Sequence, residues 1–217
     1  MRSLRIPFFI LFFGLGLFNS CDSGPSEETI IKRSLPDTLS ARQRFIARQV
    51  DLGDIRKQEE FEMRLWIKPT TNNTQEVIVI TAIGSSFICE KINLTYSEEK
   101  FPPQAEYGLK PKVESFSINV AIPIIPIDSL IALIEPEDPR TLIHQDLLDG
   151  FEERDVDGIQ YEFEYALGEK RGNFRFHCPE LYMDEFEECA RMQRIILAFE
   201  KAFDAHQLQH TPCSHHL

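Results

Sequence analysis

The chain has 217 residues, of which 42% are hydrophobic and 27% are charged, and its formal net charge is −12 at pH 7. Residues 1–20 contain two of the 23 basic residues and none of the 35 acidic ones, so the remainder carries 21 minus 35, or −14. This charge argues against nucleic-acid binding, which needs a concentrated basic face, and against binding of anionic lipid by the folded part. It favours a soluble body and, as a partner, a basic protein.

The first predicted element is an N-terminal signal peptide, residues 1–20. Arg2 and Arg5 precede an apolar run over residues 7–18, and the composition turns polar directly after Cys21. The run is shorter than the roughly twenty residues that a membrane-spanning helix needs. We therefore expect the signal to be cleaved rather than retained.

The cleavage region resembles a known type of processing site. Leu17-Phe18-Asn19-Ser20-Cys21 resembles the lipobox of bacterial lipoproteins, in the relaxed form of the Bacteroidetes type. Ser20 and Cys21 match, whereas Phe18 stands where that family prefers Leu and Asn19 where it prefers a small residue. The resemblance covers this segment alone. It implies a diacylated or triacylated Cys21, and several acyl chains hold a protein firmly at a membrane. The implied location is the cell envelope; a plain secreted protein and an uncleaved anchor are the alternatives.

The remaining chain divides into three predicted parts. Residues 21–55 are the lipidated cysteine and a polar tether, which contains a short amphipathic helix over 40–50. Residues 56–205 form a single domain, and residues 206–217 form a C-terminal tail.

Strands are predicted wherever residues alternate in polarity or are mostly β-branched. These stretches are 61–67, 76–83, 86–96, 113–122, 159–165 and 173–178. The last two form a hairpin around the turn over 168–172. On the first strand of this hairpin, Tyr161 and Phe163 lie on one face and Glu162 and Glu164 on the other.

Three helices complete the prediction. A short one covers residues 129–134. A second covers 138–150, because Asp138-Pro139 is an N-cap followed by proline and Gly150 is a stop, and it contains His144. A long one follows the capping box of Asp184 and Glu187, and its apolar stripe must pack on the sheet. The predicted class is α+β, with an antiparallel sheet packed against a long C-terminal amphipathic helix.

Four cysteines remain beyond Cys21, namely Cys89, Cys178, Cys189 and Cys213. Exported proteins meet oxidising conditions, so disulfides are permitted, and four cysteines allow three full pairings. Cys178 and Cys189 are nearest in sequence. A helix that begins only at Asp184 leaves a loop that can bring them together, which predicts a Cys178–Cys189 bridge, with two buried thiols as the alternative.

The tail holds the densest group of metal-type ligands. His206 and His210 are four residues apart and would share one face of a helix, and Cys213 follows closely. Zinc and copper accept such nitrogen and sulfur ligands. The alternative is a frayed terminus without metal.

Established catalytic motifs are absent from the sequence. It has no Gly-x-Ser-x-Gly, no His-Glu-x-x-His, no phosphate-binding glycine loop and no dinucleotide fingerprint, so we expect no enzyme and no cofactor. The hypothesis is a non-catalytic, partner-binding or shielding role in the cell envelope. A metal-binding envelope protein is one alternative. A hydrolase with a dispersed site, drawing on His144 or His177, is another, because residues that meet only in space leave no linear trace.

Overall fold

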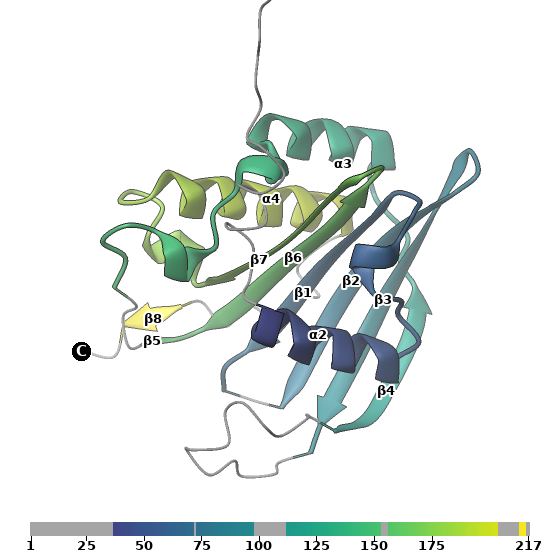
Figure 1. Cartoon of the computed structure of the whole chain (residues 1–217), viewed down its shortest axis with the longest axis horizontal. Helices are drawn as coiled ribbons and strands as arrows, with labels where there is room; N and C mark the ends of the chain where they lie inside the picture. Colours follow the sequence, from purple (N-terminus) through teal and green to yellow (C-terminus); the bar gives the residue numbers. More distant parts are fainter. Residues whose placement is uncertain (1–36, 72, 98–111, 153–155, 204–212, 216–217) are drawn as a thin grey trace, which may run out of the picture.

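The computed structural model describes residues 37–71, 73–97, 112–152, 156–203 and 213–215 (Figure 1). Its centre is an antiparallel sheet in the order β4-β3-β2-β1-β6-β7. The six strands are β1 (Glu62–Pro69), β2 (Thr74–Ile83), β3 (Ser86–Tyr96), β4 (Val113–Val120), β6 (Ile159–Leu167) and β7 (Lys170–His177). Helix α2 (Asp37–Gln49) lies against one face, and α3 (Ile127–Ile134) and α4 (Glu187–Phe203) lie against the other. The predicted α+β class is confirmed.

The alternation along β1 shows how both faces are used. Met63 and Leu65 join the larger core under α3 and α4, whereas Trp66 joins the smaller core under α2. Strands covered on both faces carry continuous apolar runs. The run Val77–Ile80 in the middle of β2 has this character, and all four of its residues are buried.

The six predicted strands are all present, with ends that differ by at most three residues. The hairpin of β6 and β7 turns at Gly168, whose φ of 62° suits glycine. A second, two-stranded sheet was not predicted. It pairs β5 (Val156–Asp157) with β8 (Ser214–His215), so the end of the predicted tail is part of the fold.

The predicted helix near residues 40–50 is present as α2, but it belongs to the folded body. Ile46, Ala47 and Val50 are buried against the sheet. Arg44 lies beside Asp54, with 4.0 Å between Nε and Oδ2. The predicted domain start at residue 56 is therefore too late. The predicted signal peptide and Cys21 lie outside the described residues.

The predicted helix over 138–150 is wrong. Asp138 adopts a left-handed conformation with φ of 37°, which interrupts the helix. Two 3₁₀ turns stand in its place, η4 (Pro139–Thr141) and η5 (Gln145–Leu147). His144 precedes η5 as its cap. Leu142 and Leu148, on either side of these turns, are buried in the larger core.

The long C-terminal helix is confirmed as α4, although it begins at Glu187 rather than directly after Asp184. Residues 182–185 form a separate turn, in which Glu185 N donates to Tyr182 O. Cys189, Met192 and Phe199 lie on the buried face of α4. Among the described residues, no helix is long and apolar enough to cross a membrane.

Candidate functional site in the open half of the sheet

The face of the sheet that carries α3 and α4 is covered over only part of its width. Over β2, β3 and β4, two adjoining pockets remain open, with cavity volumes of about 540 and 670 Å³. Both are lined by Glu76, Lys91 and Asn93, so they form one continuous depression, which we call the open-face groove. Its other polar lining residues are Thr74, Gln75, Thr95, Ser115, Ser117 and Asn119.

The floor of the open-face groove is polar and electrically balanced. Lys91 Nζ lies 2.7 Å from Glu76 Oε2, and this partly exposed pair is its only pair of opposite charges among the described lining residues. The remaining polar groups are hydroxyls and amides, which both donate and accept hydrogen bonds. Such a floor offers hydrogen-bonding groups and carries no net charge.

An apolar rim borders this floor. Ile122 and Ile124 are 83% and 64% exposed. Pro123 has no backbone N–H to donate to a strand ladder, so the strand pairing does not continue past it and the chain turns. Ile124 N donates to Ala202 O in the last turn of α4 at 2.7 Å, which holds the rim beside the floor.

None of these groove residues was singled out in the sequence. The alternation over 113–122 placed Ser115, Ser117 and Asn119 on one face, which is a detectable polar strip. Its neighbours on β2 and β3 come from separate segments, and only the pairing register brings Glu76 opposite Asn93.

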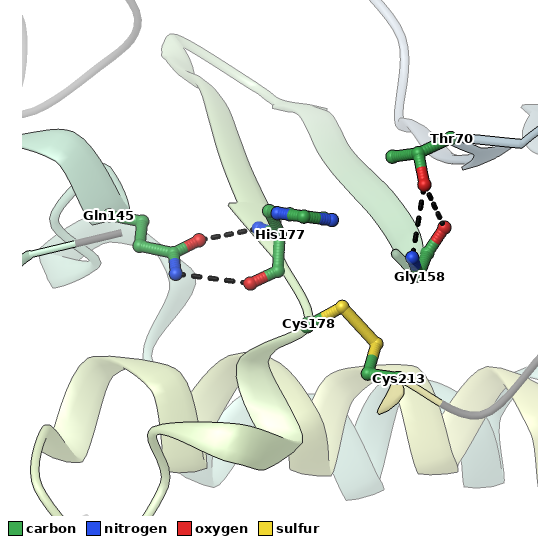
Figure 2. The surroundings of a disulfide bond; sticks show 6 residues. All are labelled: Thr70, Gln145, Gly158, His177, Cys178 and Cys213. Carbon is green, nitrogen blue, oxygen red and sulfur yellow. Dashed lines mark hydrogen bonds between the residues drawn. A yellow bond between two sulfur atoms is a disulfide. The ribbon is translucent and has the colours of Figure 1, made fainter. Parts of the chain in front are cut away.

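A second feature of interest is the junction where the end of β7 meets β8 (Figure 2). Cys178 and Cys213 form a disulfide there, across 35 residues of sequence. Gly158 packs directly against it, and a Cβ at this position would lie 2.1 Å from Cys178 Sγ. Thr70 holds Gly158 in place, since its Oγ1 accepts from Gly158 N and donates to Gly158 O, each at 3.0 Å. The close approach to sulfur therefore requires glycine at position 158.

The predicted Cys178–Cys189 bridge is wrong. Cys189 is a free thiol on the buried face of α4, whereas Cys178 turns towards Cys213 at the end of the chain. Burial, with smaller contributions from Glu188 and Glu185, raises the pKa of the Cys189 thiol to about 12. A thiol of such high pKa forms little thiolate and is unreactive. Cys89 is the other free, buried thiol among the described residues.

The disulfide also bears on the predicted metal site. Cys213 has no thiolate to offer while it is bonded to Cys178. His206 and His210 lie outside the described residues. Within the described part of the chain, one group of three metal-type ligands occurs, Cys178, Glu180 and Cys213, and its two sulfurs are bonded to each other.

Beside this junction, a side chain covers the end of the outer edge of β7, at His177. Gln145 Nε2 donates to His177 O at 3.1 Å, and Gln145 Oε1 accepts from His177 N (Figure 2). Gln145 is buried, and its amide makes the two hydrogen bonds that a neighbouring strand would make. The same short turn, η5, places His144 in the interior.

His144 is fully buried, and its surroundings favour the neutral ring. Its Nδ1 accepts from Asp146 N at 3.1 Å, so the neutral tautomer carries its proton on Nε2. Nε2 is buried and has no hydrogen-bond partner among the described residues. Burial lowers the pKa of His144 to about 4; the Asp146 carboxylate opposes this shift, and the Arg175 guanidinium adds to it.

Acid is therefore expected to destabilise the protein through His144. The folded-state pKa of His144, about 4, lies below the unfolded value of 6.5. The contribution of neutral His144 to the free energy of unfolding is therefore fully present above pH 6.5 and is lost as the pH falls towards 4. The shift corresponds to about 3 kcal/mol. In His144→Asn, which keeps an acceptor for Asp146 N, the free energy of unfolding should fall less between pH 7 and pH 4, by roughly this amount. Equal pH dependence of both proteins in urea titrations would contradict the assignment.

On the α2 side of the sheet, β1, β6 and β7 contribute a buried cluster of charged and polar side chains, which we call the charged cluster. It consists of Glu62, Arg64, Trp66, Glu162, Glu164 and Asn173, all at most 9% exposed. Three carboxylates and one guanidinium share this space. The sequence placed Glu162 and Glu164 on the polar face of the hairpin, but that face is covered rather than exposed to solvent.

Hydrogen bonds connect the charged cluster throughout. The Arg64 guanidinium donates to Glu62, to Gly53 O at 2.7 Å and, at 3.5 Å, to Glu164. Trp66 Nε1 donates to the same Glu164 oxygen at 2.8 Å. Asn173 Nδ2 bridges Glu162 and Glu164, at 2.8 Å from each. Buried ions tolerate this setting only when they are paired and hydrogen-bonded, and Arg64 supplies the positive charge.

Comparison with known proteins gave no relative. No protein-family model, no curated protein and no solved structure matches this chain.

Proposed function

We propose that this chain is an exported lipoprotein, anchored to a membrane of the cell envelope through acyl chains on Cys21, that binds a partner protein without catalysing a reaction. The observation that carries the binding role is the open-face groove. The sheet is covered on both faces over most of β1, β6 and β7, but it leaves hydrogen-bonding groups of β2, β3 and β4 uncovered beside an apolar rim. Protein interfaces combine such a polar surface with apolar anchors.

The charge of the molecule supports the choice of partner. The mature formal charge of −14 favours approach of a basic protein, and long-range attraction of this kind raises association rates. The groove itself is balanced by the Lys91–Glu76 pair, so it supplies orientation and hydrogen bonds.

The geometry gives the alternatives less support. His144 is a poor general base for a bound substrate, because its ring is fully buried and Nδ1 is occupied by Asp146 N. The tail metal site loses its sulfur ligand to the disulfide.

Site-specific photo-crosslinking in the producing cells tests the groove. A photoreactive phenylalanine analogue at Asn93, in the groove, should give a discrete adduct of higher mass, whereas the same analogue at the exposed Asp128 on α3 should give none. Lys91→Glu, which replaces the ion pair by two acids, should reduce the Asn93 adduct several-fold. Equal adducts at both positions, or no adduct at Asn93, would exclude the groove as the contact surface.

Acylation of Cys21 is tested with protein from the same cells. Mass spectrometry of the membrane-extracted protein should find an N-terminal peptide that begins at Cys21 and carries fatty-acyl mass. An unmodified N-terminus on protein recovered from the culture fluid would refute the anchor and leave the groove result unaffected.

A further inference from the structure

The two edge strands of the sheet, β7 and β4, differ in how well their outward backbone groups are protected from pairing with another strand. At the β7 edge, the Gln145 amide occupies the backbone groups of His177, and the strand carries Lys170, Arg171 and Arg175. Charged side chains and covering groups are the devices by which proteins prevent pairing at a sheet edge. Among the described residues, none bonds to the outward backbone groups of β4 between Ser115 and Val120, and this stretch has no charged residue and no proline.

The outward backbone groups of β4 belong to its apolar residues. Ala121 N donates to Cys89 O, which sets the hydrogen-bonded positions of the β3–β4 ladder at every second residue. In an antiparallel pair, the residues between those positions turn their N–H and C=O away from the partner strand. These residues are Phe116, Ile118 and Val120, whose side chains are 43%, 44% and 81% exposed on the α2 side.

The charge of the molecule restricts what can pair there. Two copies of the mature chain, each with a formal net charge of −14, repel each other, which favours a contact where charge is absent. The stretch from Ser115 to Val120 is uncharged and its apolar side chains share one face, which makes the edge complementary to itself.

We propose that two copies pair through β4, antiparallel, about a two-fold axis at Ile118, so that the six-stranded sheets of both copies join. In this register Ile118 lies opposite Ile118 of the second copy, and Phe116 lies opposite Val120. The outward N–H and C=O groups of these three residues then bond across the axis, and their side chains pack on one face. Ser117 and Asn119 face each other on the opposite side, as an isologous contact requires.

The contact is small. A single strand edge with three apolar side chains per copy falls short of the about 1,200–2,000 Å² buried in standard stable complexes. The pair is therefore reversible in solution. Anchoring of both copies in one membrane, which rests on the function proposed above, raises their effective concentration.

Cysteine cross-linking tests both the contact and its register. In full-length protein in native membranes, Ile118→Cys should form a disulfide-linked dimer on mild oxidation, because directly opposed residues lie within disulfide reach. Val120→Cys alone should cross-link at least several-fold less, and co-expression of Phe116→Cys with Val120→Cys should restore the dimer. Leu197→Cys, at an exposed apolar position on α4, is the matched control for random collision.

Sedimentation gives an independent measurement. The purified protein in mild detergent should shift from monomer towards dimer with rising concentration, and Ile118→Lys, but not Leu197→Lys, should abolish the shift. A monomer at every concentration together with no Ile118→Cys dimer would overturn the proposal, as would equal cross-linking at positions 118, 120 and 197. The cross-link does not require acylation, so failure of the anchor and failure of the pairing are distinguishable.

Discussion

Replacing Arg64 by methionine is expected to lower the free energy of unfolding by about 3–5 kcal/mol, the cost of removing one partner from a buried ion pair. Methionine preserves most of the packed length of the side chain but removes the guanidinium that binds Glu62, Glu164 and Gly53 O. The buried carboxylates then lose their positive neighbour. The loss is measured as a lower urea midpoint at pH 7 with an unchanged slope.

Arg56 provides the matched control. It pairs with Asp54 at 3.0 Å, but its side chain is half exposed, and exposed pairs contribute at most about 1 kcal/mol. Arg56→Met should therefore change the urea midpoint little. Adding Glu62→Gln to Arg64→Met should recover at least about 1 kcal/mol, because the two residues interact directly. An Arg64→Met protein as stable as Arg56→Met would contradict the description of the charged cluster.

Loss of the Cys178–Cys213 disulfide is expected to lower the free energy of unfolding by about 3–4 kcal/mol, from the chain entropy of a loop of this length. The bond closes 35 residues, and the loop contains all of α4. For a domain of this size, the loss corresponds to a fall in Tm of roughly 10 °C. The comparison is a thermal melt of the wild type with and without reductant.

The variant in which both cysteines are replaced by serine separates this bond from other effects of the reductant. Its Tm should match that of the reduced wild type and should not respond to reductant. Cys89 and Cys189 remain free thiols in both proteins, so they cancel in the comparison. A wild-type Tm that is insensitive to reductant would show that the bond does not stabilise the folded chain.

The strands and the C-terminal helix were predictable because their patterns are local. Alternation over 159–165 and the three-to-four spacing of Cys189, Met192 and Phe199 each follow from burying one side of a single element. The error at 138–150 was local too. Asp138-Pro139 is a strong helix start by composition, but Asp138 adopts a left-handed conformation, and the short turns after it bury Leu142 and Leu148 in the larger core.

The site features were not predictable, because their partners are distant in sequence. Trp66 and Glu164 are 98 residues apart, so nothing in the hairpin pattern indicates that Glu164 is buried. Cys178 reaches Cys213 only because the end of the chain returns to β5. The strand pairing between β5 and β8 that brings it there involves only two residues per strand, too short a pattern to predict. The groove exists because α4 leaves part of the sheet uncovered. Which strands remain uncovered depends on the arrangement of the whole sheet, so no single segment of the sequence indicates it.

The amide of Gln145 has a consequence for how far such a sheet can grow. A sheet with two free edges adds copies at both sides and lengthens into a filament, which is the hazard of unprotected strands. Here the N–H and C=O of His177, at the end of β7, already bond to a side chain of the same molecule, and Lys170, Arg171 and Arg175 place charges along the rest of that edge. Growth through β4 therefore stops after one addition, and the assembly is closed.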